Sequence, residues 1–223
     1  MNEEQLKYPL DSKSVEILKG FLDNELPSKI FNINWNSHFY FSTMFESLDR
    51  WLTSGTGSGL INSDGLNLKN KVGALDDWAL GIATGSLLDY SKKSRFRLAT
   101  KIDVVANAFL AIYTLNDATS NNYYGISIEA GVIKGNSKYK GTETSINLTS
   151  VGNNTFVTLE AQYSPHDGVI FFVDGVQRGK IVKNLPDINA SPKPNSIVQF
   201  VLETTGADKT AIISYFEFSQ EEL

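Results

Sequence analysis

The segment Asn121-Asn122-Tyr123-Tyr124 combines the residue types that recognise sugars. Side-chain amides exchange hydrogen bonds with sugar hydroxyls, and an aromatic face covers the apolar side of a sugar ring. Two other aromatic residues could line the same kind of cleft. The candidate carbohydrate-binding residues are therefore Trp78, Tyr90, Asn121, Asn122 and Tyr123.

A structural role explains the same residues, and we favour it. Tyr124 continues an alternating apolar set with Ile126 and Ile128, which predicts a strand with Tyr124 in the core. Asn121 and Asn122 would then form the tip of a hairpin. The other aromatic candidates would be half-buried packing residues with a lesser role in any cleft.

Carboxylates and histidines do not form a recognisable catalytic set. Retaining glycoside hydrolysis needs two carboxylates about 5 Å apart. Glu129 and Glu160 each stand alone in a predicted strand, and a pair assembled from different strands stays open as an alternative. His38 and His166 are the only histidines, and without a cysteine or a serine-centred turn they suggest neither a catalytic triad nor a zinc site. The sequence therefore predicts no catalytic residues and no enzyme.

The aspartates Asp76, Asp77 and Asp89 come nearest to a cation site. A hard cation such as Ca²⁺ takes several oxygen ligands from one loop region. Adjacent aspartates before a strand are more often solvated turn residues, so we predict no metal and no cofactor. Whether these three aspartates bind a cation stays open.

The composition is that of a folded, mildly acidic protein. Of 223 residues, 41% are hydrophobic and 20% are charged, and the net charge is -5. That charge disfavours nucleic acid as a partner, because nucleic-acid binding needs a basic face. The chain has no cysteine and no apolar run of the roughly 20 residues that span a membrane. The first residues lack the basic and apolar regions of a signal peptide, so we expect synthesis in the cytoplasm and no membrane insertion.

One helix is predicted, near the N-terminus. Apolar residues recur at helical spacing within residues 12 to 26 and end at a proline. We predict that this face contacts another subunit, through Val15, Leu18, Phe21 and Leu22. Residues 1 to 29 are thus expected to form a helical arm, and residues 30 to 223 a separate β domain.

Strand signals recur at short intervals after the arm. Arg95 to Val104 alternates between charged and apolar residues, and Phe109 to Tyr113 is apolar on both faces. Roughly a dozen such strands predict an all-β fold, an antiparallel two-sheet jelly-roll sandwich with a short N-terminal helix. Its predicted core contains Phe96, Leu98, Ile102, Phe109, Val157, Leu159 and Phe172.

The segment Val169 to Val173 is the most decisive local signal for this class. It is apolar throughout, and Asp174-Gly175 separates it from a second strand-like run. Asp-Gly supplies the positive φ angles that a tight hairpin turn requires. A two-residue β-hairpin loop is therefore predicted, with Gly175 at positive φ.

The order of these features is similar to the concanavalin A-like lectin and glucanase superfamily. An early strand at Phe41 to Trp51 precedes Asp64-Gly65-Leu66-Asn67-Leu68, and the strand from Arg95 follows. The resemblance ends with the hairpin and a final strand, Tyr215 to Gln220. It implies a last strand paired with the first. Hydrolases of this superfamily carry two glutamates around an aspartate on one strand, a motif that this sequence lacks.

These observations lead us to expect a non-enzymatic structural or attachment module of a virion or similar assembly. Members of the superfamily include lectins, glycoside hydrolases, adhesins and viral structural proteins, and an ordinary viral jelly roll gives much the same strand pattern. The expected partners are other subunits of a homo-oligomer and a cell-surface glycan, and the expected location is a virion or extracellular particle. Two alternatives remain: a stand-alone carbohydrate-binding lectin domain, and a glycoside hydrolase with an unrecognised carboxylate pair.

Overall fold

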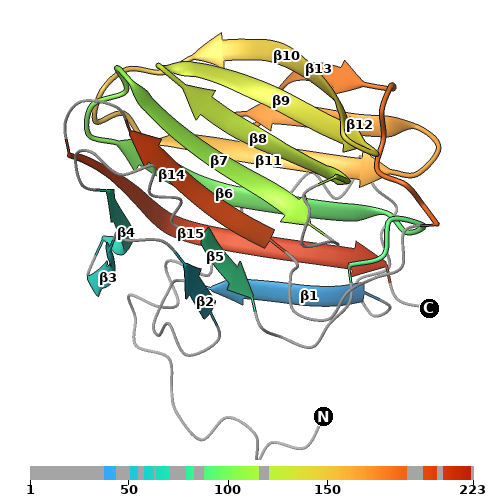
Figure 1. The fold of residues 1–223 in the computed structure, drawn as a ribbon, viewed down its shortest axis with the longest axis horizontal. Coiled ribbons are helices and arrows are strands. Elements are labelled where there is room, and N and C mark those ends of the chain that lie inside the picture. Colours follow the sequence, from blue (N-terminus) through green and yellow to red (C-terminus); the bar gives the residue numbers. More distant parts are fainter. Residues whose placement is uncertain are drawn as a thin grey trace, which may run out of the picture. The chain divides into compact units, whose positions relative to one another are not determined.

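The computed structural model describes residues 38–43, 51–54, 58–62, 64–70, 79–82, 88–115, 121–189, 198–204 and 208–221. These residues form strands in two antiparallel sheets and include no helix, hence none that could span a membrane (Figure 1). Several predictions lie outside the described residues: the arm of residues 1 to 29 with Val15, Leu18, Phe21 and Leu22, and the residues Asp76, Asp77 and Trp78.

The long C-terminal strand β15 (Lys209–Glu221) organises an eight-stranded sheet. One side of β15 pairs with β6 (Ser94–Ile102). Its other side pairs with β4 (Gly65–Asn70) along the first half and with β1 (His38–Thr43) along the second. The last strand thus lies against the first, as the resemblance implies. The sheet is completed by β3 (Ser58–Asn62) beyond β4, and by β11 (Val157–Ser164), β12 (Gly168–Val173) and β13 (Val176–Ile181) beyond β6.

The second sheet has seven strands and lies in front in Figure 1. Four strands that follow one another in sequence pair in turn: β7 (Ala108–Leu115), β8 (Tyr123–Glu129), β9 (Val132–Tyr139) and β10 (Thr142–Ser150). The sheet continues from β7 through β14 (Val198–Thr204), β5 (Ala79–Ile82) and β2 (Trp51–Ser54). Neighbours drawn from distant parts of the chain are typical of a jelly roll. The predicted all-β, two-sheet sandwich is confirmed.

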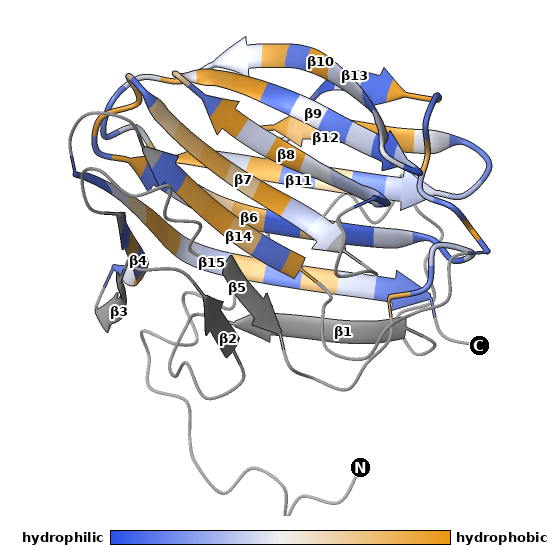
Figure 2. Cartoon of the chain, in the orientation of Figure 1, coloured by the Kyte–Doolittle hydropathy of each residue, from blue (hydrophilic) through white to orange (hydrophobic). Residues whose placement is uncertain are grey.

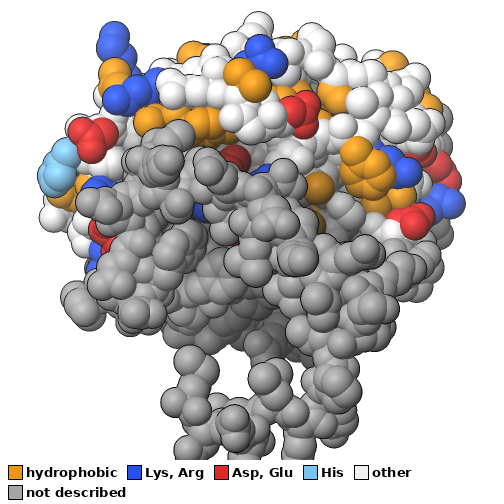
Figure 3. All heavy atoms as spheres, turned by 180° about the vertical axis from the view of Figure 1, so that it is seen from behind, with side chains coloured by type: hydrophobic (Ala, Val, Ile, Leu, Met, Phe, Trp, Pro, Cys, Tyr) orange, Lys and Arg blue, Asp and Glu red, His pale blue; other side chains and the backbone are white. Residues whose placement is uncertain are grey.

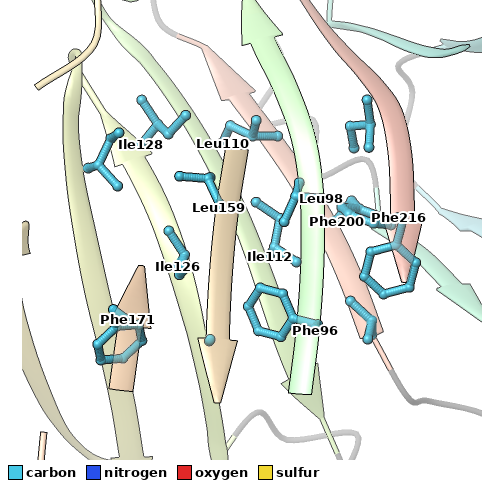
Figure 4. Close-up of a cluster of buried hydrophobic side chains, with 14 of the residues drawn as sticks. Phe96, Leu98, Leu110, Ile112, Ile126, Ile128, Leu159, Phe171, Phe200 and Phe216 are labelled. Atoms are coloured by element: carbon cyan, nitrogen blue, oxygen red, sulfur yellow. The ribbon is translucent and has the colours of Figure 1, made fainter. Parts of the chain in front are cut away.

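The hydrophobic core lies between the two sheets. In Figure 2, hydrophobic residues are concentrated along β7 and β14 in the middle of the seven-stranded sheet. Figure 4 shows side chains of both sheets meeting in the core. The eight-stranded sheet contributes Phe96, Leu98, Leu159, Phe171 and Phe216, and the seven-stranded sheet contributes Leu110, Ile112, Ile126, Ile128 and Phe200.

Five of the seven predicted core residues belong to this cluster: Phe96, Leu98, Ile102, Val157 and Leu159. The prediction is wrong for Phe109, which is half-buried and outward-facing because it alternates with the inward Leu110. Phe172 is buried, but it lies outside the cluster. Its cross-strand partner is Glu160, on the outer face of the eight-stranded sheet.

The hairpin between β12 and β13 forms as predicted. Val173 pairs with Val176, which leaves Asp174 and Gly175 as a two-residue loop with φ values of 51° and 74°. Two positive φ angles identify a type I′ turn, whose twist matches that of the flanking strands.

Candidate functional site

An aromatic cluster lies on the outer face of the seven-stranded sheet. We call Tyr113, Tyr123, Lys138 and Glu143 the tyrosine cluster. Lys138 is the cross-strand partner of both Tyr123 and Glu143, so these three side chains form one row across β8, β9 and β10. The row faces outward because the neighbouring Tyr124 points into the core.

The two rings of the tyrosine cluster support each other. Their centroids are 4.4 Å apart with an interplanar angle of 36°. The Tyr123 hydroxyl donates a 2.6 Å hydrogen bond to Glu143 Oε2, and Lys138 Nζ lies 5.4 Å from the centroid of the Tyr123 ring. Tyr123 is only 5% exposed, whereas Tyr113 is half-buried and Glu143 is exposed. Tyr113 therefore presents the accessible aromatic surface, and Tyr123 holds it in place.

Gly125 creates the space for this arrangement. It is the cross-strand partner of Tyr113. A Cβ atom at position 125 would lie 2.5 Å from Cδ1 of Tyr113, so only glycine lets the ring lie over β8. In the local sequence Tyr-Tyr-Gly, Tyr124 points into the core, Tyr123 points outward, and Gly125 leaves room for the ring of Tyr113.

Electrostatics keep both hydroxyls of the cluster protonated. Burial, followed by the nearby Glu143 carboxylate, raises the pKa of Tyr113 above its usual range. Burial also raises the pKa of Tyr123, and its hydrogen bond to Glu143 adds to the effect. The cluster can therefore offer hydroxyl donors, a carboxylate acceptor and an aromatic surface together.

The predicted loop residues Asn121 and Asn122 have different placements. Asn122 is buried, and its Oδ1 accepts hydrogen bonds from the backbone N–H of Lys140 (3.1 Å) and of Asp187 (3.3 Å). It thereby fixes two neighbouring segments to the start of β8. Asn121 is exposed and lies two residues before Tyr123, so its side chain is accessible at the end of the cluster. Asn122 thus has a structural role at the start of β8, and residues 116 to 120 of the predicted hairpin tip lie outside the described residues.

Tyr90 is placed in the core. Its hydroxyl donates hydrogen bonds to the carbonyl oxygens of Thr114 (2.8 Å) and Asn122 (3.1 Å). The rings of Tyr124 and Tyr163 meet Tyr90 at steep angles. Tyr90 therefore offers no ring face to a sugar, because burial and packing use the whole side chain.

The sequence analysis missed Tyr113, Lys138 and Glu143. Residues 109 to 113 are apolar or aromatic throughout, which hid the outward orientation of Tyr113. The alternation of Tyr113 with the inward Ile112 was the available signal. Lys138 and Glu143 could not be assigned, because their positions depend on the register of β8, β9 and β10.

A second polar group lies on the outer face of the eight-stranded sheet. We call Arg95, Glu160, Gln162 and Glu217 the arginine cluster. Arg95 Nε is 3.0 Å from Glu160 Oε1, and Arg95 Nη2 is 3.0 Å from Glu217 Oε1. All four residues are buried. The structure thus brings together two glutamates that are 57 residues apart in sequence, because β6 pairs with both β11 and β15.

Both glutamates of the arginine cluster are fully engaged. Gln162 Nε2 donates to Glu160 Oε1, and the Tyr215 hydroxyl donates to Glu217 Oε2. Gln162 Oε1 has no hydrogen-bond partner within the part of the chain that the structure describes. A carboxylate held by a guanidinium and by a second donor is poorly placed to protonate a substrate or to attack one.

Comparisons with known proteins bear on the fold. No family model and no curated protein sequence matches this chain. Among solved structures, a Shewanella oneidensis MR-1 protein of unknown function, SO2946, has a TM-score of 0.62 at 16% identity, covering 83% of this chain and 87% of that one. The β-glucanase of Bacillus licheniformis has a TM-score of 0.61 at 12% identity, covering 82% and 98%. The domain has the concanavalin A-like lectin and glucanase fold.

A third neighbour of this concanavalin A-like domain is a binding module. The binding domain of botulinum neurotoxin DC, in complex with SialylT, has a TM-score of 0.56 at 14% identity and covers 78% of this chain and 43% of that one. At these identities the likeness concerns the fold alone. None of the three neighbours is described as a virion component, so the expected viral link draws no support from them.

Across the described ranges of the concanavalin A-like domain, no three His, Cys, Asp or Glu side chains come together as a metal site. Asp89, the one candidate ligand that is described, has a local role. Its Oδ1 accepts hydrogen bonds from Ser91 N (2.9 Å) and Ser91 Oγ (2.7 Å), which closes a turn before β6.

Proposed function

We propose that the domain is a non-enzymatic attachment module that binds a glycan at the tyrosine cluster. The observation that carries this proposal is the half-buried ring of Tyr113, which lies over Gly125 with its centroid 4.4 Å from that of Tyr123. A sugar stacks its apolar face on such a ring, and its hydroxyls exchange hydrogen bonds with nearby polar groups. Glu143 and the exposed Asn121 provide those groups at the end of the sheet.

The arginine cluster supports the non-enzymatic part of the proposal. Glu160 and Glu217 form one pair of carboxylates on the outer face of the eight-stranded sheet, and Arg95 holds both. A retaining hydrolase needs one carboxylic acid and one nucleophilic carboxylate free to reach the glycosidic bond. The similarity to a β-glucanase is therefore a similarity of scaffold in this proposal.

Attachment to a larger assembly is a second proposal, carried by the amphipathic pattern of the arm. In the predicted helix, one face would be apolar, with Val15, Leu18, Phe21 and Leu22. A helix of this length is marginal alone in water, so that face would need a covering surface. A chain shortened to begin at Lys29 should stay folded and lose its contacts with other subunits of a virion or similar particle. An unfolded shortened chain beside a monomeric full chain would overturn this second proposal, whatever the glycan result.

A glycan array probed with the full chain tests the first proposal. Tyr113→Ala should weaken the binding of the glycans that bind by about 5- to 30-fold, because one stacking ring contributes on the order of 1–2 kcal/mol. Tyr139→Ala is the matched control: Tyr139 is 38% exposed on β9 and lies at a position that alternates away from Lys138. An array without a bound glycan, or equal binding by Tyr113→Ala, would contradict the proposal.

A hydrolysis assay separates this function from the enzyme alternative. The full chain should release no reducing ends from β-glucans or other polysaccharides. Turnover that disappears in Glu160→Gln would show that the arginine cluster is a catalytic site and would replace the proposed function.

A further inference from the structure

The edge of the eight-stranded sheet at β13 carries an unusual set of exposed side chains. We call Val176, Arg178, Lys180, Val182 and Lys183 the basic edge. All five are exposed, and the two valines are 51% and 61% exposed. Lys and Arg side chains gather beside a hydrophobic one at the upper left of Figure 3, the region of β13 and the segment after it.

Among the described strands, β13 has a paired neighbour on one side only. It is the last strand in the order of the sheet, and β12 is its one partner within the described residues. β10 approaches its inner face, where Ile146 and Leu148 lie over Gly179. An edge strand of this kind presents a row of N–H and C=O groups that another strand can pair with.

The three cations of the basic edge have no ion pair among the described residues. Two carboxylates lie in the adjoining turns, fewer than the three cations: Asp174 accepts a hydrogen bond from Thr158 N, and Asp167 accepts one from Ser164 Oγ, each at 2.8 Å. The basic edge is therefore a local excess of positive charge on a chain with a net charge of -5.

Edge strands also use lysine and arginine to prevent unwanted pairing. That role accounts for Arg178 and Lys180, and the register shift between Phe171 and Phe172 leaves Arg178 without a cross-strand partner. It does not account for Val176 and Val182, because exposed valines on an edge promote pairing instead of preventing it. The combination selects among partners: apolar contact and backbone pairing attract a strand, and the cations require that strand to be acidic.

We propose that the basic edge binds an extended acidic segment of another polypeptide, which adds to β13 as a further strand. Such a segment satisfies the open backbone groups of β13 and covers the valines. It also neutralises Arg178 and Lys180 on the strand and Lys183 just beyond its end at Ile181. An anionic polysaccharide would use the cations alone and leave the backbone and the valines in water. An anionic lipid surface would be held by three cations only, too few for stable binding.

The probe is a fluorescent peptide of alternating glutamate and valine, titrated into the full chain and followed by anisotropy at low salt. Its affinity should fall by about tenfold or more in the double variant Arg178→Glu, Lys180→Glu. Lys69→Glu, an exposed lysine on β4 of the same sheet, should leave the affinity unchanged. Val176→Ser with Val182→Ser should weaken binding while keeping every charge.

A second peptide with the same charge, but N-methylated at alternate residues, tests the strand pairing. It should bind about tenfold more weakly, because it cannot donate the ladder hydrogen bonds. The proposal is overturned if the first peptide does not bind, if the double variant binds it normally, or if the N-methylated peptide binds equally well. Equal binding of hyaluronate or of phosphatidylserine vesicles would also overturn it, since charge alone would then explain the surface.

Discussion

The buried tyrosines should make the domain unfold in alkaline solution. Tyr124 and Tyr163 lie in the core. The Tyr124 hydroxyl shares a 2.8 Å hydrogen bond with Ser94 Oγ, and the Tyr163 hydroxyl donates one of 2.8 Å to the carbonyl oxygen of Tyr90. Burial raises the pKa of both well above the ordinary value of 10.0. In the unfolded chain both ionise near pH 10, so their contribution to stability is complete below that pH and is lost as the pH rises above it.

The size of the effect follows from proton linkage. Each tyrosine that ionises only in the unfolded chain lowers the free energy of unfolding by about 1.4 kcal/mol per pH unit above pH 10. Tyr123, which is 5% exposed and bonded to Glu143, adds a third such group to Tyr124 and Tyr163. These three groups alone remove about 4 kcal/mol per unit, so a domain of about 8 kcal/mol should unfold by about pH 12, and Tyr113, whose pKa is also raised, lowers the midpoint further.

Circular dichroism and absorbance at 295 nm, recorded together against pH, check this prediction. Tyrosine ionisation of the buried set should coincide with loss of β structure. Tyr163→Phe should raise the pH midpoint of unfolding by about half a unit. The variant loses about 1 kcal/mol of hydrogen bonding, but it also removes one of the groups whose ionisation destabilises the domain. Tyr139→Phe, at an exposed position, is the control and should not move the midpoint. Reversible ionisation of every tyrosine near pH 10 with native circular dichroism would refute the reasoning.

Further predictions concern stability and can be measured by urea denaturation. Arg95→Met should destabilise the domain by about 3–5 kcal/mol, because it leaves Glu160 and Glu217 buried without their cation. Adding Glu160→Leu and Glu217→Leu to Arg95→Met should restore most of the lost stability. If Arg95→Met alone leaves the stability unchanged, the arginine cluster is solvated. Gly175→Val should cost about 1–2 kcal/mol through backbone strain alone, because no atom lies within 4 Å of a Cβ there, whereas Gly175→Asn should cost less. Phe96→Ala should cost about 3–5 kcal/mol through lost burial and a cavity, and a loss below 1 kcal/mol would place Phe96 outside the core.

Local patterns in the sequence were enough for several strands of the fold, although they did not identify β9 or β10. The alternation from Arg95 to Val104 predicted a strand with its apolar residues inward, because successive side chains in a strand point to opposite faces. The strand forms but ends at Ile102, so the prediction is wrong for Val104, which is exposed. Asp174-Gly175 predicted its own turn, since Asp and Gly tolerate the positive φ angles that a two-residue loop demands. Tyr124 was predicted to lie in the core because it falls on the same face of its strand as Ile126 and Ile128. Each of these signals acts within a few residues of the chain.

Only the tertiary structure decided which outward-facing residues meet. Tyr113 meets Tyr123 because β7 pairs with β8, and Tyr123 meets Glu143 across β9. Glu160 and Glu217 come together because β6 pairs with a strand on each side. The same limit explains Phe109, whose apolar neighbours suggested burial although its face of the sheet lies outside the sandwich. Alternation tells which residues share a face of one strand, but not which strands pair. That pairing is set by burial of the whole core, a property of all the strands together.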